Sequence, residues 1–231
     1  MKITEVYQKY KNTPQMMEHQ LTVAAVAGLV CDNWERGMTR NLTRNDAEAK
    51  FGIDRENIVV ACLLHDIGNI VKFNFDRTKD IFPELLAKPE DREYWENVKK
   101  EFTEKYGKSS HEATVKIIKE IGVSDRVFEL VDSVGFNQGV NNAWTGDFGK
   151  KICAYSDMRV KPSGVSSLEE RMADLRVRYH NHPEGETDRD KFEQALRKIE
   201  QQIFEHCSIK PEDITEQAIK DRKEALKNFE I

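Results

Sequence analysis

Apolar residues recur at helical spacing along most of the chain. Val23, Val26, Ala27 and Val30 follow His19 in steps of three and four, which places all five positions on one face of a helix. Comparable patterns predict helices over residues 3–11, 14–34, 54–67, 91–106, 110–121, 125–134, 146–160 and 167–180. Strand patterns are few, and we find no internal repeat or low-complexity segment. This series of helices predicts an all-α fold in which the helices form a bundle.

The composition becomes strongly charged after residue 183, where two long amphipathic helices are expected. The first has an apolar stripe and the second, which Pro211 begins, has another; the stripes are Phe192, Leu196, Ile199, Ile203 and Phe204, then Ile214, Ala218, Ile219, Leu226 and Phe229. They predict a C-terminal helical hairpin that packs on the bundle or on a second subunit, as in a homodimer. We therefore divide the chain into residues 1–183 and a helical extension, residues 184–231.

The adjacent pair His65-Asp66 ends the strongly apolar run 61–64 and is followed closely by Gly68. An imidazole and a carboxylate beside buried apolar residues lose hydration, and a divalent cation would satisfy both. Successive residues on a helix diverge by about 100°, so the pair can converge on one ion only where the helix ends. Gly68 is expected to end it in the left-handed conformation. The alternative is a frayed helix end, with His65 bonded to a carbonyl and Asp66 in solvent.

Two further candidate ligands lie on separate apolar segments. His19 is expected in the second turn of a helix that has Thr13 as its N-cap and Pro14 as its first residue. Asp157 follows Cys153 by one helical turn. A single buried His or Asp is more often a satisfied core residue than a ligand. Three such positions on three helices favour a metal site.

In this order, His19, His65-Asp66 and Asp157 resemble the H…HD…D signature of the HD-domain metal-dependent phosphohydrolases. The segment 156–171 strengthens the likeness, because it is similar to the AD-x-R-V…G-V-x-S-L-E-E-R run of some bacterial and archaeal members. The resemblance, which covers about residues 14–180, implies that these four residues bind one divalent metal on an all-helical core. It also implies catalysis at Asp66, through hydrolysis of a phosphomonoester or phosphodiester by metal-bound water. A nucleotide is the favoured substrate.

The chemistry of the four side chains agrees with this resemblance. Two imidazoles and two carboxylates suit Mn²⁺, Fe²⁺, Co²⁺, Ni²⁺ or Zn²⁺, and Mg²⁺ is an option less natural for imidazole. Four protein ligands around an octahedral ion leave two positions for water or a phosphate oxygen. Relatives with two metals bring additional histidines, whereas this chain has only six histidines in all. A single metal ion is therefore expected.

Other residues are candidates for proton transfer and phosphate binding. His111 is expected in the first turn of a helix, where backbone N–H groups favour anions, although an exposed histidine without a role fits the pattern equally well. Asn69 stands three positions after Asp66, where single-metal nucleotidases of the superfamily have Glu and cyclic-dinucleotide phosphodiesterases have Lys. Asparagine can orient a water or a substrate oxygen but cannot transfer a proton. The candidate phosphate-binding residues are Lys72, Arg159, Lys161 and Arg171.

Two segments between the candidate residues have less certain structures. The charged section 70–107 is expected either as a lid over the site or as an ordinary packed excursion, and residues 135–144 as a loop that could border the substrate.

Two other functional classes also stay open. A non-catalytic nucleotide- or metal-binding regulator is compatible with Asn69. An HD-type di-iron oxygenase is disfavoured because the extra histidines are missing.

Composition limits the binding partners and the cellular compartment that we expect for the protein. Its charged fraction of 33% and net charge of −5 argue against extended nucleic-acid binding, which normally requires a basic face. The four cysteines lack C-x-x-C spacing and are expected as free thiols in a reducing compartment. The longest apolar run, around residues 21–31, is too short to span a bilayer. We expect a cytoplasmic enzyme that acts on a small phosphorylated substrate and has no membrane partner.

Overall fold

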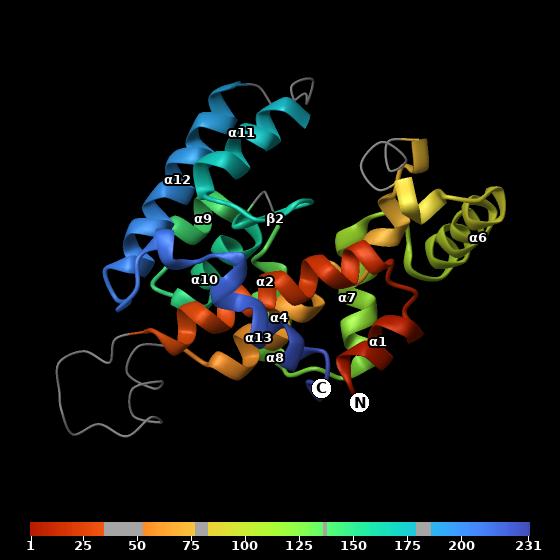
Figure 1. Ribbon diagram of the computed structural model, residues 1–231, viewed down its shortest axis with the longest axis horizontal. Helices are drawn as coiled ribbons and strands as arrows, with labels where there is room; N and C mark the ends of the chain where they lie inside the picture. The colour runs from red at the N-terminus through yellow and green to blue at the C-terminus, as the bar shows by residue number, and fades with distance from the viewer. Residues whose placement is uncertain (35–52, 77–82, 136–137, 179–185) are drawn as a thin grey trace.

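The computed structural model describes residues 1–34, 53–76, 83–135, 138–178 and 186–231. Within these ranges the chain is mostly helical, which confirms the predicted all-α class (Figure 1). The α-helices are α1 (Ile3–Lys9), α2 (Pro14–Asp32), α4 (Arg55–Leu64), α6 (Pro89–Tyr106), α7 (Ser110–Ile121), α8 (Asp125–Asp132), α9 (Gly139–Trp144), α10 (Phe148–Met158), α11 (Leu168–Arg178), α12 (Glu186–Phe204) and α13 (Glu216–Leu226). Short 3-10 helices are η1 (Asn69–Lys72), η2 (Pro83–Leu86) and η4 (Pro211–Asp213).

The described strands form one antiparallel pair, β1 (Val160–Lys161) and β2 (Gly164–Val165), in which Val160 faces Val165. Each of the helices predicted before residue 183 is present, and its described ends agree to within one turn. The prediction that Pro211 begins the last helix is wrong, because Pro211 begins η4 and Thr215 caps α13, which begins at Glu216. One helix was not predicted: residues 135–144 were expected to form a loop, but residues 139–144 form helix α9. Its glycine and asparagines favour a helix poorly, so packing against α12 and α10 explains why a helix forms.

Helices α2 and α4 cross in the centre of the molecule, and α8, α10 and α13 pack around them (Figure 1). Residues 20–28 of α2 are all buried, as expected for a helix that is apolar on all sides. Ile58, Leu63, Ile117 and Ile152 are fully buried and join the same core. Helix α2 carries His19, α4 leads directly into His65-Asp66, and α10, which packs on both, carries Asp157.

The two C-terminal helices dock on different parts of the bundle. Helix α12 packs on α9 and α10, whereas α13 packs on α2. Leu196 and Ile199 are buried on α12, and Ile219 is buried on α13, so most of each predicted apolar stripe faces the bundle. Ala218, which was assigned to the second stripe, is exposed. Figure 1 places the two chain ends together, where the amide of Ile231 donates to Met1 O over 3.0 Å. The division at residue 183 stays a prediction.

The section between Ile70 and Gly107 packs on the bundle where it is described. Helix α6 lies against η1, η2 and α7, and Lys99 Nζ donates to the carbonyl of Phe73 over 2.7 Å. All four cysteines are free thiols, with Cys62 and Cys153 fully buried. None of the described helices has the length and apolar character needed to cross a membrane.

Candidate metal centre

The His-Asp pair lies in a tight turn at the end of α4. Helix α4 begins at the N-cap Asp54, whose side chain accepts from the amide of Asn57, and it ends at Leu64. In the next residues, the amide of Ile67 donates a hydrogen bond to Leu64 O and the amide of Asn69 donates one to Asp66 O, and η1 follows. This change from α-helix to tighter turns allows His65 and Asp66 to face a common point, as the sequence predicts.

The prediction for Gly68 is wrong, because its φ of −92° and ψ of 3° are not left-handed. The glycine is required by the close approach of α7. A Cβ at this position would lie 2.8 Å from both Ala113 C and Thr114 Oγ1. The amide of Gly68 donates to Thr114 Oγ1 over 3.1 Å, so the two segments are also bonded. The missing side chain lets α7 pack directly on the turn that carries Asp66.

We expect Gly68→Ala to push α7 away from this turn and to lower the free energy of unfolding by about 1–3 kcal/mol, the usual range for overpacking. Urea unfolding monitored by circular dichroism measures this loss. Gly146→Ala is the matched control, because nothing lies within 4 Å of the added Cβ at that position. Equal stability of the two variants would contradict the steric requirement at Gly68.

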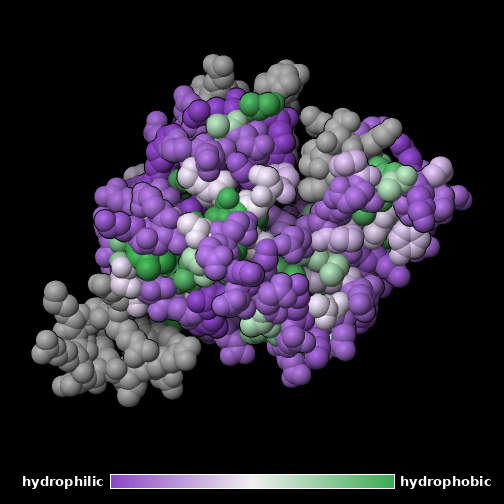
Figure 2. Space-filling model, in the orientation of Figure 1, coloured by the Kyte–Doolittle hydropathy of each residue, from purple (hydrophilic) through white to green (hydrophobic). Residues whose placement is uncertain are grey.

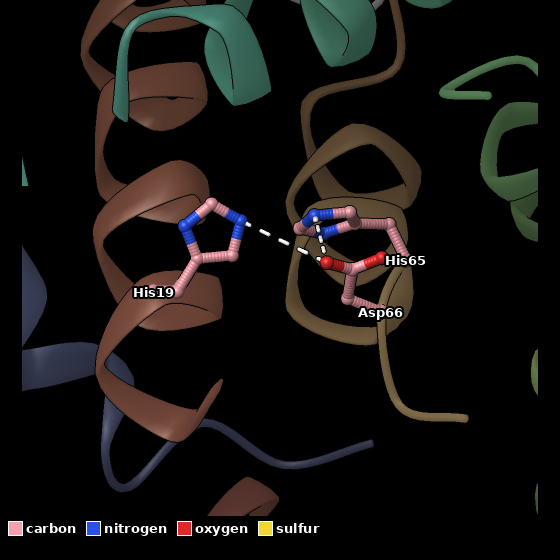
Figure 3. Close-up of side chains that lie close together, drawn as sticks. All are labelled: His19, His65 and Asp66. Atoms are coloured by element: carbon pink, nitrogen blue, oxygen red, sulfur yellow. Dashed lines mark ion pairs between the residues drawn. The ribbon is translucent and has the colours of Figure 1, made fainter. Parts of the chain in front are cut away.

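His19 and Asp157 approach this turn from two other helices. Thr13 caps α2 by accepting from the amide of Met16, and His19 lies in the second turn, as predicted. Asp147 caps α10 in the same way, and Asp157 is its penultimate residue. Figure 3 shows His19 pointing across from α2 toward His65 and Asp66. Three separate helices therefore place these four side chains.

The candidate ligand atoms lie close enough for one ion. His19 Nε2 is 4.0 Å from Asp66 Oδ2 and 3.1 Å from Asp157 Oδ1. His65 Nε2 is 3.7 Å and 3.5 Å from the same two oxygens. Ligand atoms that each lie about 2.0–2.2 Å from an ion can be at most about 4.4 Å apart. Each of these four distances meets that limit, so the side chains could hold a divalent metal.

The environment of His65 gives an independent test of this fit. Its Nδ1 lies 2.8 Å from the carbonyl of Cys62, which accepts the Nδ1 proton and directs Nε2 toward the carboxylates. Nε2 is buried and has no hydrogen-bond partner. A buried polar atom without a partner is costly, and a metal-bound histidine typically donates its other ring proton to a carbonyl or carboxylate. Both observations suit a metal ligand.

The four side chains also shift one another's protonation. Burial lowers the pKa of His65, but the nearby carboxylates of Asp66 and Asp157 outweigh it and raise this pKa to about 9. Burial raises the pKa of Asp157, but the hydrogen bond with His19 and the nearby charge of His65 bring it well below its usual range. Without a metal, the site is therefore an ion-paired cluster in which His65 carries a proton at neutral pH.

Metal binding at pH 7 is accordingly expected to release a proton from His65, and the affinity should rise as the pH increases toward about 9. The protonated imidazole stabilises the metal-free fold below its ordinary pKa of about 6.5, and this contribution is lost as the pH passes about 9. Calorimetric Mn²⁺ titrations in two buffers with different ionisation enthalpies measure the release. A binding heat that does not depend on the buffer would contradict it.

A cavity of about 1770 Å³ borders the four candidate ligands. It also brings in most of the other predicted site residues, namely Asn69, Lys72, His111, Lys161 and Arg171. Asn69 is buried, whereas Lys72 and His111 are exposed. The surface around this region is mostly hydrophilic, and Figure 2 shows it hollowed between the part that contains α11 and α12 and the part that contains α6. Among the predicted site residues, Arg159 alone does not line the cavity.

Arg159 is directed into the protein, where 3% of the residue is exposed. Its Nε donates to Ser166 O over 2.6 Å, and its Nη atoms donate to the hydroxyl of Tyr155 and to the carbonyls of Pro211 and Ile214. These bonds join the end of α10 to β2 and η4. The expectation that Arg159 contacts phosphate relied on its nearness to Asp157 in the sequence, and we correct it here: the guanidinium is structural.

Two further residues border the predicted site and were not predicted from the sequence. Asp132, at the end of α8, has Oδ1 3.2 Å from His111 Nε2. Thr114 receives the hydrogen bond from Gly68 and lines the cavity. Thr114 follows His111 by one helical turn, so its position on the same face of α7 was available from the spacing. Nothing in the local sequence indicated that Asp132 would reach His111.

The model of the HD domain family matches residues 16–178, which is more than half of the chain. The chain therefore belongs to the HD domain family, whose members are mostly metal-dependent hydrolases. The match includes the candidate ligands His19, His65, Asp66 and Asp157. No curated protein and no solved structure matches the chain.

Proposed function

We propose that the protein is a metal-dependent phosphohydrolase that cleaves a phosphomonoester or phosphodiester, with a nucleotide as the favoured substrate. The observation that carries the proposal is the buried Nε2 of His65, which has no hydrogen-bond partner and lies beside carboxylates at the wall of a large cavity. Family membership supports the same reading. His19, His65, Asp66 and Asp157 would hold the ion.

The side chains around the ligands suit a phosphorylated substrate. A divalent ion bound there would lower the pKa of a water molecule and neutralise charge on phosphoryl oxygens. Lys72 and Lys161 line the cavity, and the charge of Lys161 also reaches the carboxylate of Glu170. Arg171 lines it as well, with a side chain 12% exposed and Nη1 3.2 Å from Asp174. These cations would bind phosphate oxygens, and Asn69 would orient a water or a substrate oxygen.

The remaining cavity wall suits a large organic group. Met172, Leu175 and Phe192 contribute apolar surface from α11 and α12. The volume exceeds the range of about 300–1,000 Å³ that is usual for small-molecule sites. A polar end beside the ligands and an apolar part further along match a phosphate attached to a large group such as a nucleoside. This match supports the nucleotide class without selecting a base or sugar.

The test is a phosphate-release screen of nucleotides and sugar phosphates with Mn²⁺, Co²⁺, Ni²⁺, Zn²⁺ and Mg²⁺, combined with elemental analysis of the purified protein. We expect release that requires a divalent ion, stops with a chelator and places ¹⁸O from labelled water in the phosphate product. A phosphorylated side chain trapped on the productive pathway would refute hydrolysis by water. Tight nucleotide binding without turnover would favour the non-catalytic regulator, which the amide at Asn69 leaves open.

Lys161→Ala is expected to keep its metal content and melting temperature while losing at least about tenfold in kcat/KM, or about 1.4 kcal/mol of transition-state stabilisation. The reason is that its ammonium lines the cavity close to the ligand helix α10. Lys220→Ala is the matched control, since Lys220 is exposed on α13 and does not line the cavity. Wild-type kinetics in both variants would show that Lys161 does not anchor substrate.

A further inference from the structure

His111 and Asp132 form a pair at the cavity that is separate from the metal ligands. His111 lies in the first turn of α7, and Asp132 is the last residue of α8. Their Nε2 and Oδ1 atoms are 3.2 Å apart. No other contact of His111 is found within the described residues, so Nδ1 is the ring nitrogen left for another group. Because His111 lines the cavity, that group can be a bound substrate.

The fold fixes this pair relative to the candidate ligands. The amide of Gly68 donates to Thr114 Oγ1, and the absence of a side chain at Gly68 lets α7 approach. His111 precedes Thr114 by one turn and shares its face of α7, where such residues lie about 5–6 Å apart. Asp66 is two residues before Gly68. The hydrogen bond and the close contact between Gly68 and α7 therefore hold the first turn of α7, which contains His111, beside the turn that contains Asp66.

The proposed reaction needs a proton donor that the ligand set does not supply. When a phosphate ester is cleaved, the leaving oxygen takes a proton unless it is already a stable anion. Asn69 cannot donate one, and lysine and arginine side chains are ordinarily too weakly acidic to act as the donor near neutral pH. The cavity carboxylates other than the candidate ligands are engaged elsewhere: Glu18 pairs with Lys223, and Glu193 pairs with Arg176. Glu216 accepts from the amide of Val165 and also pairs with Lys223. Hydrogen bonds with its own backbone amide and with Gln15 lower the pKa of Glu84.

We propose that His111 is the general acid for the leaving group and that Asp132 is the positioning residue that orients its ring. The inference rests on the proposed phosphohydrolase function. Water forms a new bond to phosphorus, the bond from phosphorus to the leaving oxygen breaks, and that oxygen takes the Nδ1 proton of His111. The attacking water releases its proton to solvent, and the imidazole regains one from solvent. Asp132 accepts the Nε2 proton throughout, which holds the ring in one orientation.

Aryl phosphates of similar shape separate this role from a structural one. Phenyl phosphate needs a proton on its leaving oxygen, whereas p-nitrophenyl phosphate leaves readily as an anion. His111→Gln should lower kcat with phenyl phosphate by about 100-fold, the low end for general acid catalysis, and change kcat with p-nitrophenyl phosphate by less than about threefold. KM should change little with either substrate. Equal losses on both substrates would overturn the acid role.

Asp132 is tested by two substitutions and a control. Asp132→Asn should lower kcat with phenyl phosphate by about tenfold, and Asp132→Glu should restore part of it by returning a carboxylate. Asp125→Asn makes the same change at the exposed start of α8 and should leave kcat unchanged. A wild-type rate in Asp132→Asn would overturn the positioning role.

Nitrogen-15 spectra of the histidine rings give a readout that does not depend on activity. The neutral ring of His111 should carry its proton on Nε2 in the wild type and lose this preference in Asp132→Asn. A wild-type protein that cleaves neither aryl phosphate nor any nucleotide would refute the proposed function, and the acid role with it. The inference alone would be refuted by a different result: the wild type cleaves the substrates, Asp132→Asn leaves the ring spectra of His111 unchanged, and His111→Gln lowers kcat equally with both aryl phosphates.

Discussion

Asp66→Ala is expected to abolish both stoichiometric metal binding and phosphate release. Asp66 Oδ2 lies 4.0 Å from His19 Nε2 and 3.7 Å from His65 Nε2, so it completes the group formed by these two imidazoles. The ligand atoms of all three residues lie within 4.8 Å of one another. Without this carboxylate, the site loses one negative charge and one of the four proposed ligands. The remaining set would bind a divalent ion far more weakly.

Elemental analysis and thermal unfolding measure this effect. Added Mn²⁺ should raise the melting temperature of the wild type by mass action and leave that of Asp66→Ala unchanged. The matched control is Asp221→Ala, which removes an exposed carboxylate on α13 and should retain both metal and response. Full metal occupancy in a folded Asp66→Ala protein would reject the ligand assignment, whatever the substrate.

The sequence predicted the parts of this site that depend on local chemistry. Thr13 and Pro14 define where α2 begins, and the position of His19 on its inner side follows from helical geometry. The apolar run before His65 predicts a buried helix end in the same way. The family resemblance then connected these positions with Asp157. Convergence of the three helices could not be derived from any one segment.

Predictions were wrong or incomplete where contacts between distant segments decide the outcome. Gly68 is required by the approach of α7, which lies some forty-five residues further along the chain, rather than by its own backbone angles. Helix α9 forms where α12 and α10 pack against it, although its sequence is a poor helix former. Asp132 reaches His111 from a different helix. In each case the determining partner is far away in sequence, and single-segment patterns do not record it.

Arg159→Ala is expected to destabilise the fold by about 3–5 kcal/mol, as is typical when a buried charged group leaves its partners unpaired. The guanidinium donates to the carbonyls of Ser166, Pro211 and Ile214, and to the hydroxyl of Tyr155. That hydroxyl in turn donates to Glu200 on α12 over 2.8 Å. The substitution would leave three carbonyls without this donor and would open space between α10 and the segment before α13.

Urea unfolding measures the loss, and two variants define its origin. Arg159→Lys should recover only part of the stability, because one ammonium cannot reach acceptors on three segments as a planar fork does. Arg92→Ala, at an exposed arginine that pairs with Asp76 and Glu96, should change stability little. If Arg159→Ala instead kept full stability and lost about tenfold in kcat/KM, Arg159 would contact substrate and its buried position would not describe the protein during turnover. Reduced stability with normal kcat/KM per folded molecule would establish that this arginine acts through the fold, and that phosphate binding depends on the cavity's other cations.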